Sequence, residues 1–226
     1  MRILDRCGAL TGAAYVLLVG IGEEMSTSPG PHGAHPTGQQ NIADMRWVAD
    51  HPAAQIGVTL ELVGFALFVL FIGYLCTRVR DAGWLATAAL AGGILAVAIK
   101  LGSVAPILVA YLLRDEISPE TGRVLFDLNG AAFVVTGLPT GLFVACAAGA
   151  ALATRTLGRV LGVGGVVVGV AAVLGTAATG VHLLAANPLP FLFCLLWILA
   201  VSVRLVFQRT ARPADVVAPD ADVAAV

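Results

Sequence analysis

Residues 83–113 read GWLATAALAGGILAVAIKLGSVAPILVAYLL, and this stretch decides the fold class. A helix needs about 20 predominantly apolar residues to cross the hydrocarbon core of a bilayer, at a rise of about 1.5 Å per residue. The segment exceeds that length and holds a single charged side chain, that of Lys100. It predicts a membrane-spanning helix, and the same test applied along the chain identifies five more.

Together the apolar stretches predict an all-α integral membrane protein, a six-helix bundle within residues 1–208. The predicted spans are 7–22, 54–77, 83–113, 128–153, 160–185 and 189–207, with an external loop at 23–53 and a disordered tail at 209–226. The first span is short and needs tilt, local thinning or neighbouring helices. It also resembles a signal peptide, because Arg2 and Arg6 precede its apolar core. No small-residue cleavage site precedes Glu23-Glu24, so an uncleaved helix is expected.

The composition excludes several classes of protein. Of 226 residues, 58% are hydrophobic and 12% are charged, and the mean hydropathy is +0.92. The charged fraction is about half that of an average soluble domain. This excludes a soluble globular protein, a disordered chain and a nucleic-acid binder. The cysteines lie in or beside apolar runs and predict neither a disulfide framework nor a thiolate metal site: Cys7, Cys76, Cys146 and Cys194.

Basic residues predict the orientation, because loops rich in arginine and lysine stay in the cytoplasm. With six spans, one side of the membrane carries nine arginines: Arg2, Arg6, Arg78, Arg80, Arg155, Arg159, Arg204, Arg209 and Arg212. The other side carries only Arg46, Arg114 and Arg123. We therefore expect a multi-pass protein of the cell membrane with both termini in the cytoplasm.

Two external segments carry helix signals. Residues 40–49 predict a short interfacial helix with Ile42, Met45 and Trp47 on one side. Ser118-Pro119-Glu120 is typical of a helix start with proline at the first helical position. The fourth membrane helix is therefore expected to begin outside the bilayer.

Four ionisable side chains fall inside the predicted spans, in the middle or outer half of the bilayer: Glu61, Lys100, Asp127 and His182. Each burial costs at least about 2.5 kcal/mol and needs a physical reason. Glu61 and Lys100 have opposite signs on consecutive helices, so we expect them to approach within ion-pair distance. That pair is either a structural contact or part of a charged pocket open to the outside. Asp127 has a simpler partner in Arg123, four residues earlier on one helix face.

Polar stripes extend the same region. Asn129, Thr136 and Thr140 share one face of the fourth span, and Thr176, Thr179 and His182 follow three-residue steps on the fifth. The alternative for each threonine is a hydrogen bond to the carbonyl one turn back. Pro106 and Pro139 interrupt two helices, as at some membrane binding sites.

Histidines next to acids raise the question of a metal site. His32, His35, His51 and His182 all lie on the predicted external side. No two have the i, i+4 spacing of helical ligands, and the first two fall in a Gly- and Pro-rich segment. We expect a solvated loop, with no metal and no cofactor.

Glycines four residues apart indicate close helix packing. The pairs are Gly8 and Gly12, Gly137 and Gly141, Gly158 and Gly162, and Gly165 and Gly169. Span 160–185 is the richest in Gly, Ala and Val, so it is expected to be the central helix. The spacing mainly indicates packing within one chain and gives only weak support for a homo-oligomer.

Several short motifs occur together in one order. They are Thr11-Gly12-Ala13-Ala14-Tyr15, Ile56-Gly57 with Glu61-Leu62, Ser118-Pro119-Glu120, Asp127-Leu128-Asn129 and Arg159-Val160-Leu161-Gly162. Over about residues 5–208 this arrangement resembles the DUF4386 family of bacterial six-helix membrane proteins. Gln55 and Asn129 depart from the resemblance, since family members often carry a basic residue at the first position and a histidine near the second. The resemblance implies a fold and a bacterial inner-membrane location but no reaction.

The favoured functional prediction is an outward-facing polar pocket that binds or transports a small amphiphilic molecule, such as a lipid, from the external side. The lipid bilayer itself is the other expected partner. The predicted binding residues of the pocket are Glu61, Lys100, Asp127, Asn129 and His182. One alternative is a structural or regulatory membrane partner without a ligand. Another is a membrane enzyme that uses Glu61 or Asp127 as acid or base, with Lys100 shifting the pKa. The sequence contains none of the common catalytic motifs, which disfavours the enzyme.

Overall fold

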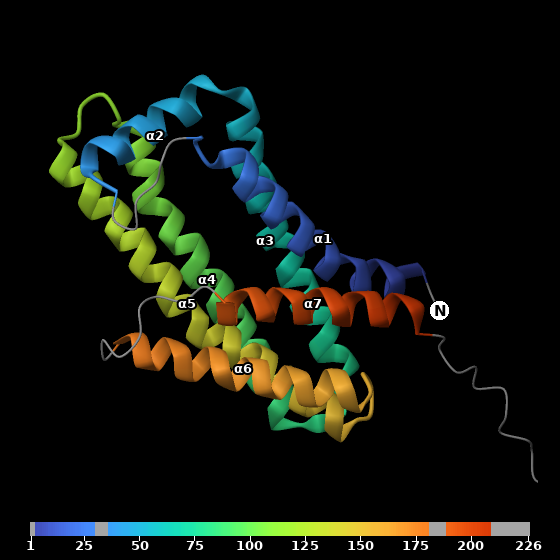
Figure 1. Ribbon diagram of the computed structural model, residues 1–226. Coiled ribbons are helices and arrows are strands. Elements are labelled where there is room, and N and C mark those ends of the chain that lie inside the picture. Colours follow the sequence, from blue (N-terminus) through green and yellow to red (C-terminus); the bar gives the residue numbers. More distant parts are fainter. Residues whose placement is uncertain (1–2, 30–35, 181–188, 209–226) are drawn as a thin grey trace, which may run out of the picture.

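The computed structural model describes residues 3–29, 36–180 and 189–208, and within these ranges all regular structure is helical. Figure 1 shows the arrangement of the helices. The elements are α1 (Ile3–Ser26), α2 (Gly38–Asp50), α3 (Pro52–Arg78), the 3-10 helix η1 (Arg80–Ala82), α4 (Trp84–Leu112), α5 (Pro119–Ala153), α6 (Arg159–Gly180) and α7 (Leu189–Phe207).

Six of these helices are long and apolar enough to cross a membrane: α1, α3, α4, α5, α6 and α7. This confirms the predicted all-α fold and the prediction of six helices long and apolar enough to span a membrane. Large apolar side chains such as Leu17, Leu70 and Val167 point outward and are exposed, as expected of helices surrounded by lipid. The predicted tail at 209–226 lies outside the described residues.

The first helix is longer than predicted. The apolar run 7–22 predicts a short span, whereas α1 has 24 residues, equivalent to about 36 Å of helix. Backbone hydrogen bonds continue past the apolar run, so the helix takes in Asp5 at one end and Glu23 and Glu24 at the other. The helix is therefore longer than its apolar stretch, and charged residues extend it at both ends.

The helix α2 extends the predicted 40–49 segment by a few residues. A capping box starts it: the amide of Gln40 donates to the Thr37 hydroxyl (3.3 Å), and the amide of Thr37 donates to the Gln40 side chain (2.7 Å). Ile42 and Val48 are buried, and α2 packs on α3, α4 and α5. A β-carbon on Gly38 would collide with the backbone of Pro119, so α2 is docked closely on the start of α5.

The central helix is α5, not the glycine-rich segment 160–185 that the sequence favours. α5 starts at the predicted signal, with Ser118 as N-cap and Pro119 in the first turn. It packs against α2, α4, α6 and α7. Only some glycines of α6 lie on its packed face: Gly165 and Gly169 contact α5 and α7, while Gly164 is exposed and a β-carbon there would meet nothing within 4 Å. Glycine content therefore identified a close contact but not the centre of the bundle.

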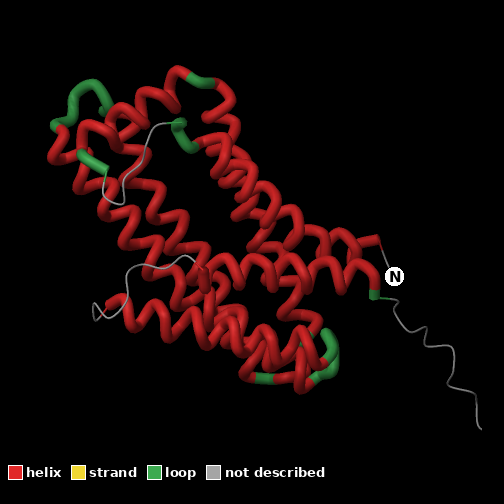
Figure 2. Tube along the Cα trace, viewed as in Figure 1, coloured by secondary structure: helices red, strands yellow, loops and turns green. Residues whose placement is uncertain are grey.

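The molecule has two distinct halves. At one end, called the η1 half, the turn around η1, the α5–α6 turn and the end of α7 come together; Gln208 of the α7 end donates to the Thr156 carbonyl of the α5–α6 turn. The other end, called the α2 half, carries α2 and the α4–α5 loop. Figure 2 shows the α1–α3 pair and the α4–α5 pair diverging toward the α2 half.

Aromatic rings fill the η1 half. The Phe68 ring stacks on Tyr15 with centroids 4.3 Å apart and meets Phe143 edge-on at 5.6 Å. Phe143 in turn lies edge-on to Trp197 at 6.5 Å. The Trp197 indole donates to the Leu161 carbonyl at 2.9 Å. This chain of rings joins α1, α3, α5 and α7 and closes the bundle below the point where the helices separate.

Candidate functional site

A cavity of about 660 Å³ lies between the diverging helices of the α2 half. Five helices, α1 to α5, contribute to its walls. Most of its lining is apolar, including Leu62, Phe65, Ile107, Leu108 and Phe126. Polar side chains interrupt this surface, and they include Gln55, Glu61, Lys100, Tyr111 and Asn129. Three of the five predicted binding residues, Glu61, Lys100 and Asn129, therefore line one cavity.

Glu61 occupies the wall formed by α1 and α3. The Ser26 hydroxyl of α1 donates to its Oε1 at 2.9 Å. A β-carbon on Gly22 would lie 2.6 Å from the Glu61 Cγ, and one on Gly57 would lie 2.7 Å from the Gly22 carbonyl oxygen. Glycine at both positions thus lets the two helices approach and leaves space for the carboxylate.

Gly22, Gly57 and Ser26 are functional positions that sequence reasoning missed. Gly22 and Ser26 are four residues apart on α1, and Gly57 and Glu61 are four apart on α3. Residues with this spacing share a helix face. A glycine one turn before a polar residue, repeated on two helices, was the signal that could have located this contact.

Lys100 occupies the opposite wall, on α4. Its ammonium lies over the Phe133 ring of α5, 4.9 Å from the ring centroid. At the helical rise, Lys100 is about 18 Å from the end of α4, and Glu61 is about 13 Å from the start of α3. The lysine is therefore the deeper of the two charges.

The expected ion pair between Glu61 and Lys100 is absent from the part of the chain that the structure describes, where no oxygen of Glu61 lies within 4.0 Å of the ammonium. The reason is the divergence of the helices. α3 packs mainly on α1 and α4 mainly on α5, and each charged side chain contacts its own close neighbour, Ser26 or Phe133. Two side chains of opposite charge therefore line one cavity without a direct contact between them.

The other predicted site residues separate into two groups. Asp127 is exposed, is not among the cavity-lining residues, and pairs with Arg123 at 3.6 Å. It lies two residues before Asn129, and about 100° per residue turns it to another face of α5. His182 falls outside the described residues, as do His32 and His35.

The threonine stripes behave differently on their two helices. Thr136 and Thr140 of α5 are buried and border a second cavity of about 10 Å³ beneath Lys100, a volume near the minimum for one water molecule. Thr136 also donates to the Ala132 carbonyl at 2.8 Å. Thr176 of α6 donates to the Ala172 carbonyl at 2.9 Å. The second cavity marks the floor of the α2 half.

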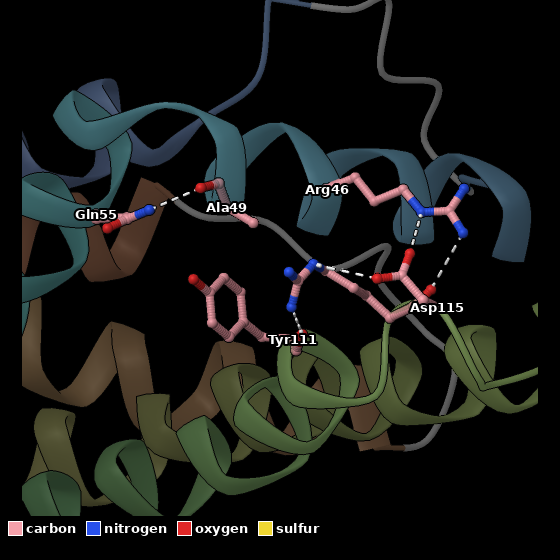
Figure 3. A network of polar contacts seen from close by, with 6 residues as sticks. Arg46, Ala49, Gln55, Tyr111 and Asp115 are labelled. Carbon is pink, nitrogen blue, oxygen red and sulfur yellow. Dashed lines mark hydrogen bonds and ion pairs between the residues drawn. The ribbon is translucent and has the colours of Figure 1, made fainter.

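α2 forms the outer cover of the cavity, with Met45 and Val48 among the lining residues. Figure 3 shows the contacts that hold it: the Arg46 guanidinium pairs with Asp115 at 3.0 Å, and the Gln55 amide donates to the Ala49 carbonyl at 2.8 Å. These contacts tie α2 to the α4–α5 loop and to the start of α3.

The remaining histidine, His51, has a local role. Its Nδ1 lies 2.7 Å from the Trp47 carbonyl oxygen, and its ring stacks on Trp47 with centroids 4.5 Å apart. Across residues 3–29, 36–180 and 189–208, no three His, Cys, Asp or Glu side chains are grouped as metal ligands would be.

Comparison with known proteins adds no assignment. No family model, curated protein or solved structure matches the chain. The cavity and its lining residues are therefore the basis for a functional argument.

Proposed function

We propose that this chain is a multi-pass membrane protein that binds a small amphiphilic molecule in the cavity between α1 and α5. The observation that carries the proposal is a cavity of about 660 Å³ whose apolar walls hold two separate charges, Glu61 and Lys100. Ligand pockets typically have volumes of about 300–1,000 Å³ and a mostly apolar lining with a few convergent polar groups. Such a lining complements a molecule with an apolar part and a polar head.

A purely structural role for the two charges explains less. Burying a charged group in a membrane helix costs free energy, and a structural ion pair lowers that free energy by direct contact between the two charges. Glu61 and Lys100 each contact another helix instead. The closely packed rings of the η1 half also demonstrate that this chain can fill its interior, so an unfilled α2 half is consistent with a space kept for a ligand.

We further propose that the cavity faces the outside of a bacterial cell. The nine-to-three distribution of arginines supports a cytoplasmic η1 end, and the resemblance of the ordered motifs to the DUF4386 family favours a bacterial inner membrane. Both termini would then be cytoplasmic, and α2 would cover the external side. A cavity that a ligand can enter from the external side alone is sufficient for binding. Transport would also require the rings of Phe68, Phe143 and Trp197 to separate.

A cavity-filling substitution tests the proposed binding. Gly130 lines the cavity, and a β-carbon there meets nothing within 4 Å. Gly102 of α4 has the same open surroundings but does not line the cavity. Gly130→Phe should abolish saturable binding, and Gly102→Phe is the matched control that should retain it.

Binding is measured by calorimetry on protein in dodecyl maltoside, with four dodecyl probes of different head group. These are dodecanoate, dodecyltrimethylammonium, N-dodecyl-N,N-dimethylglycine and monododecanoylglycerol. Saturable binding of at least one probe to the wild type, lost in Gly130→Phe and kept in Gly102→Phe, supports the proposal. Absence of binding by all four, or equal binding by both variants, overturns it.

A further inference from the structure

We infer that the ligand of this cavity has a zwitterionic head, whose cationic group binds at Glu61 and whose anionic group binds at Lys100. The inference rests on the proposed function and specifies the chemical class of the ligand. Three features carry it: the separation of the two charges, the polar groups beside each of them, and the charge balance of the cavity.

The cationic site is the wall formed by α1 and α3. Glu61 accepts one hydrogen bond, from Ser26 at 2.9 Å, whereas a carboxylate can accept about four. Glu23 also lines the cavity from α1. Two acidic side chains on adjacent helices give this wall a negative potential, which is complementary to an ammonium group.

The anionic site is the wall formed by α4 and α5. Lys100 is the only lysine of the sequence and, among the described residues that line the cavity, the only basic one. Asn129 lies four residues before Phe133, so it shares the helix face over which the ammonium lies. Its side chain also lines the cavity and has no hydrogen bond with the described part of the chain. An ammonium and a free amide together suit a carboxylate or a phosphate.

Two acids on one wall, Glu23 and Glu61, and Lys100 on the other are the charged residues of the described lining, and this arrangement disfavours a head group of a single sign. A simple anion would pair with Lys100 and leave Glu61 uncompensated in a region of low dielectric constant. A simple cation would do the reverse. Electrostatic interactions are strong in such a region, so a ligand with both charges compensates both walls at once. The apolar lining, which includes Leu62, Ile107 and Phe126, would contact its alkyl chain.

The same probe set distinguishes these head groups because all four share a dodecyl chain. N-Dodecyl-N,N-dimethylglycine carries both an ammonium and a carboxylate, and each charged probe carries one of them. The wild type should bind the zwitterion at least about tenfold more tightly than either singly charged probe, the scale of one charge-assisted contact. Equal affinities, or a preference for one singly charged probe, would overturn the zwitterion while leaving the proposed function intact.

Two variants assign the charges to their walls. Lys100→Met should reduce the affinity for the zwitterion to about that for dodecyltrimethylammonium, and Glu61→Gln should reduce it to about that for dodecanoate. Asp127→Asn removes an acid outside the cavity and is the matched control, with unchanged affinities. An unaltered preference for the zwitterion in both variants would overturn the assignment. The wild-type comparison decides the inference even where a variant does not fold, and failure of all four probes would reject the proposed function itself.

Discussion

The η1 half and the α2 half share the helices α1, α3, α4 and α5 but are packed in opposite ways. In the η1 half, α5 presents a run of alanines with no exposed surface, Ala147, Ala148, Ala150 and Ala151, and small residues allow neighbouring backbones to approach. In the α2 half, α3 and α4 separate and larger side chains line a cavity. The difference teaches that this bundle closes where small residues let the helix backbones approach and interlocking rings fill the remaining space, and opens where neither occurs.

Contacts of Gly92 illustrate the closed half. A β-carbon there would lie 2.9 Å from the Phe143 amide nitrogen and 3.0 Å from the Pro139 carbonyl oxygen. α4 and α5 therefore approach at backbone distance beside Pro139. Closer to the N-terminus of α5, Phe126 and Phe133 line the cavity between the diverging helices. One helix thus provides the packed base and one wall of the cavity.

The largest expected effect comes from truncating a ring in each half. Phe143 is fully buried between Phe68 and Trp197, so Phe143→Ala should reduce the free energy of unfolding by about 3–5 kcal/mol. Phe126→Ala, on the same helix but beside a cavity, should cost less than about 1.5 kcal/mol because it creates little new void. Unfolding by SDS in mixed micelles measures both. Equal losses would contradict the contrast between the halves.

Glycine substitutions on α5 sharpen the same contrast. A β-carbon on Gly141 would lie 2.6 Å from the Gly169 carbonyl oxygen, so Gly141→Ala should destabilise the protein by about 1–3 kcal/mol. Gly130→Ala enters open space and should change stability by less than about 0.5 kcal/mol. The same SDS titration compares the two variants, and a larger effect at Gly130 would show that the α2 half is closed.

A smaller effect is expected where the cavity wall is held by one hydrogen bond. Ser26→Ala removes the donor to Glu61 and should lower the free energy of unfolding by about 1 kcal/mol. Thr59→Val is the control on α3, because the Thr59 hydroxyl donates only to the Gln55 carbonyl of its own helix. If both variants are equally stable, the Ser26 contact does not hold the wall.

The smallest effect concerns the cover of the α2 half. Arg46 and Asp115 pair at 3.0 Å, but both side chains are more than half exposed. A double-mutant cycle of Arg46→Ala and Asp115→Ala should give a coupling of about 0.2–1 kcal/mol that falls as salt is added. A coupling above about 2 kcal/mol would mean that this pair, rather than the packing of Ile42 and Val48, fixes α2.

Much of the fold could be predicted because hydropathy fixes which segments cross the membrane. Position along these segments assigned Glu61, Lys100 and Asn129 to the middle or outer half of the membrane, and the structure places all three around one cavity. Depth does not determine which way a side chain faces, so it could not separate Asp127 from Asn129.

Predicting the Glu61–Lys100 contact required the distance between α3 and α4. That distance depends on contacts between residues far apart in sequence, such as Gly22 with Gly57. The prediction that span 160–185 is the central helix was wrong for the same reason, since glycine content indicates a close approach on one face of α6 and not how many helices surround it. The sequence therefore predicted the elements and their depth better than the pairing between them.

Thiol labelling in intact cells tests the central claim, an external cavity in the α2 half above a closed η1 half, most directly. In a background lacking the four native cysteines, single cysteines are placed at Gly130, Phe143 and Thr154. An impermeant methanethiosulfonate reagent should label Gly130→Cys and should be slowed by N-dodecyl-N,N-dimethylglycine, while Phe143→Cys and Thr154→Cys stay unlabelled. Labelling of Thr154→Cys with protection of Gly130→Cys would contradict the account.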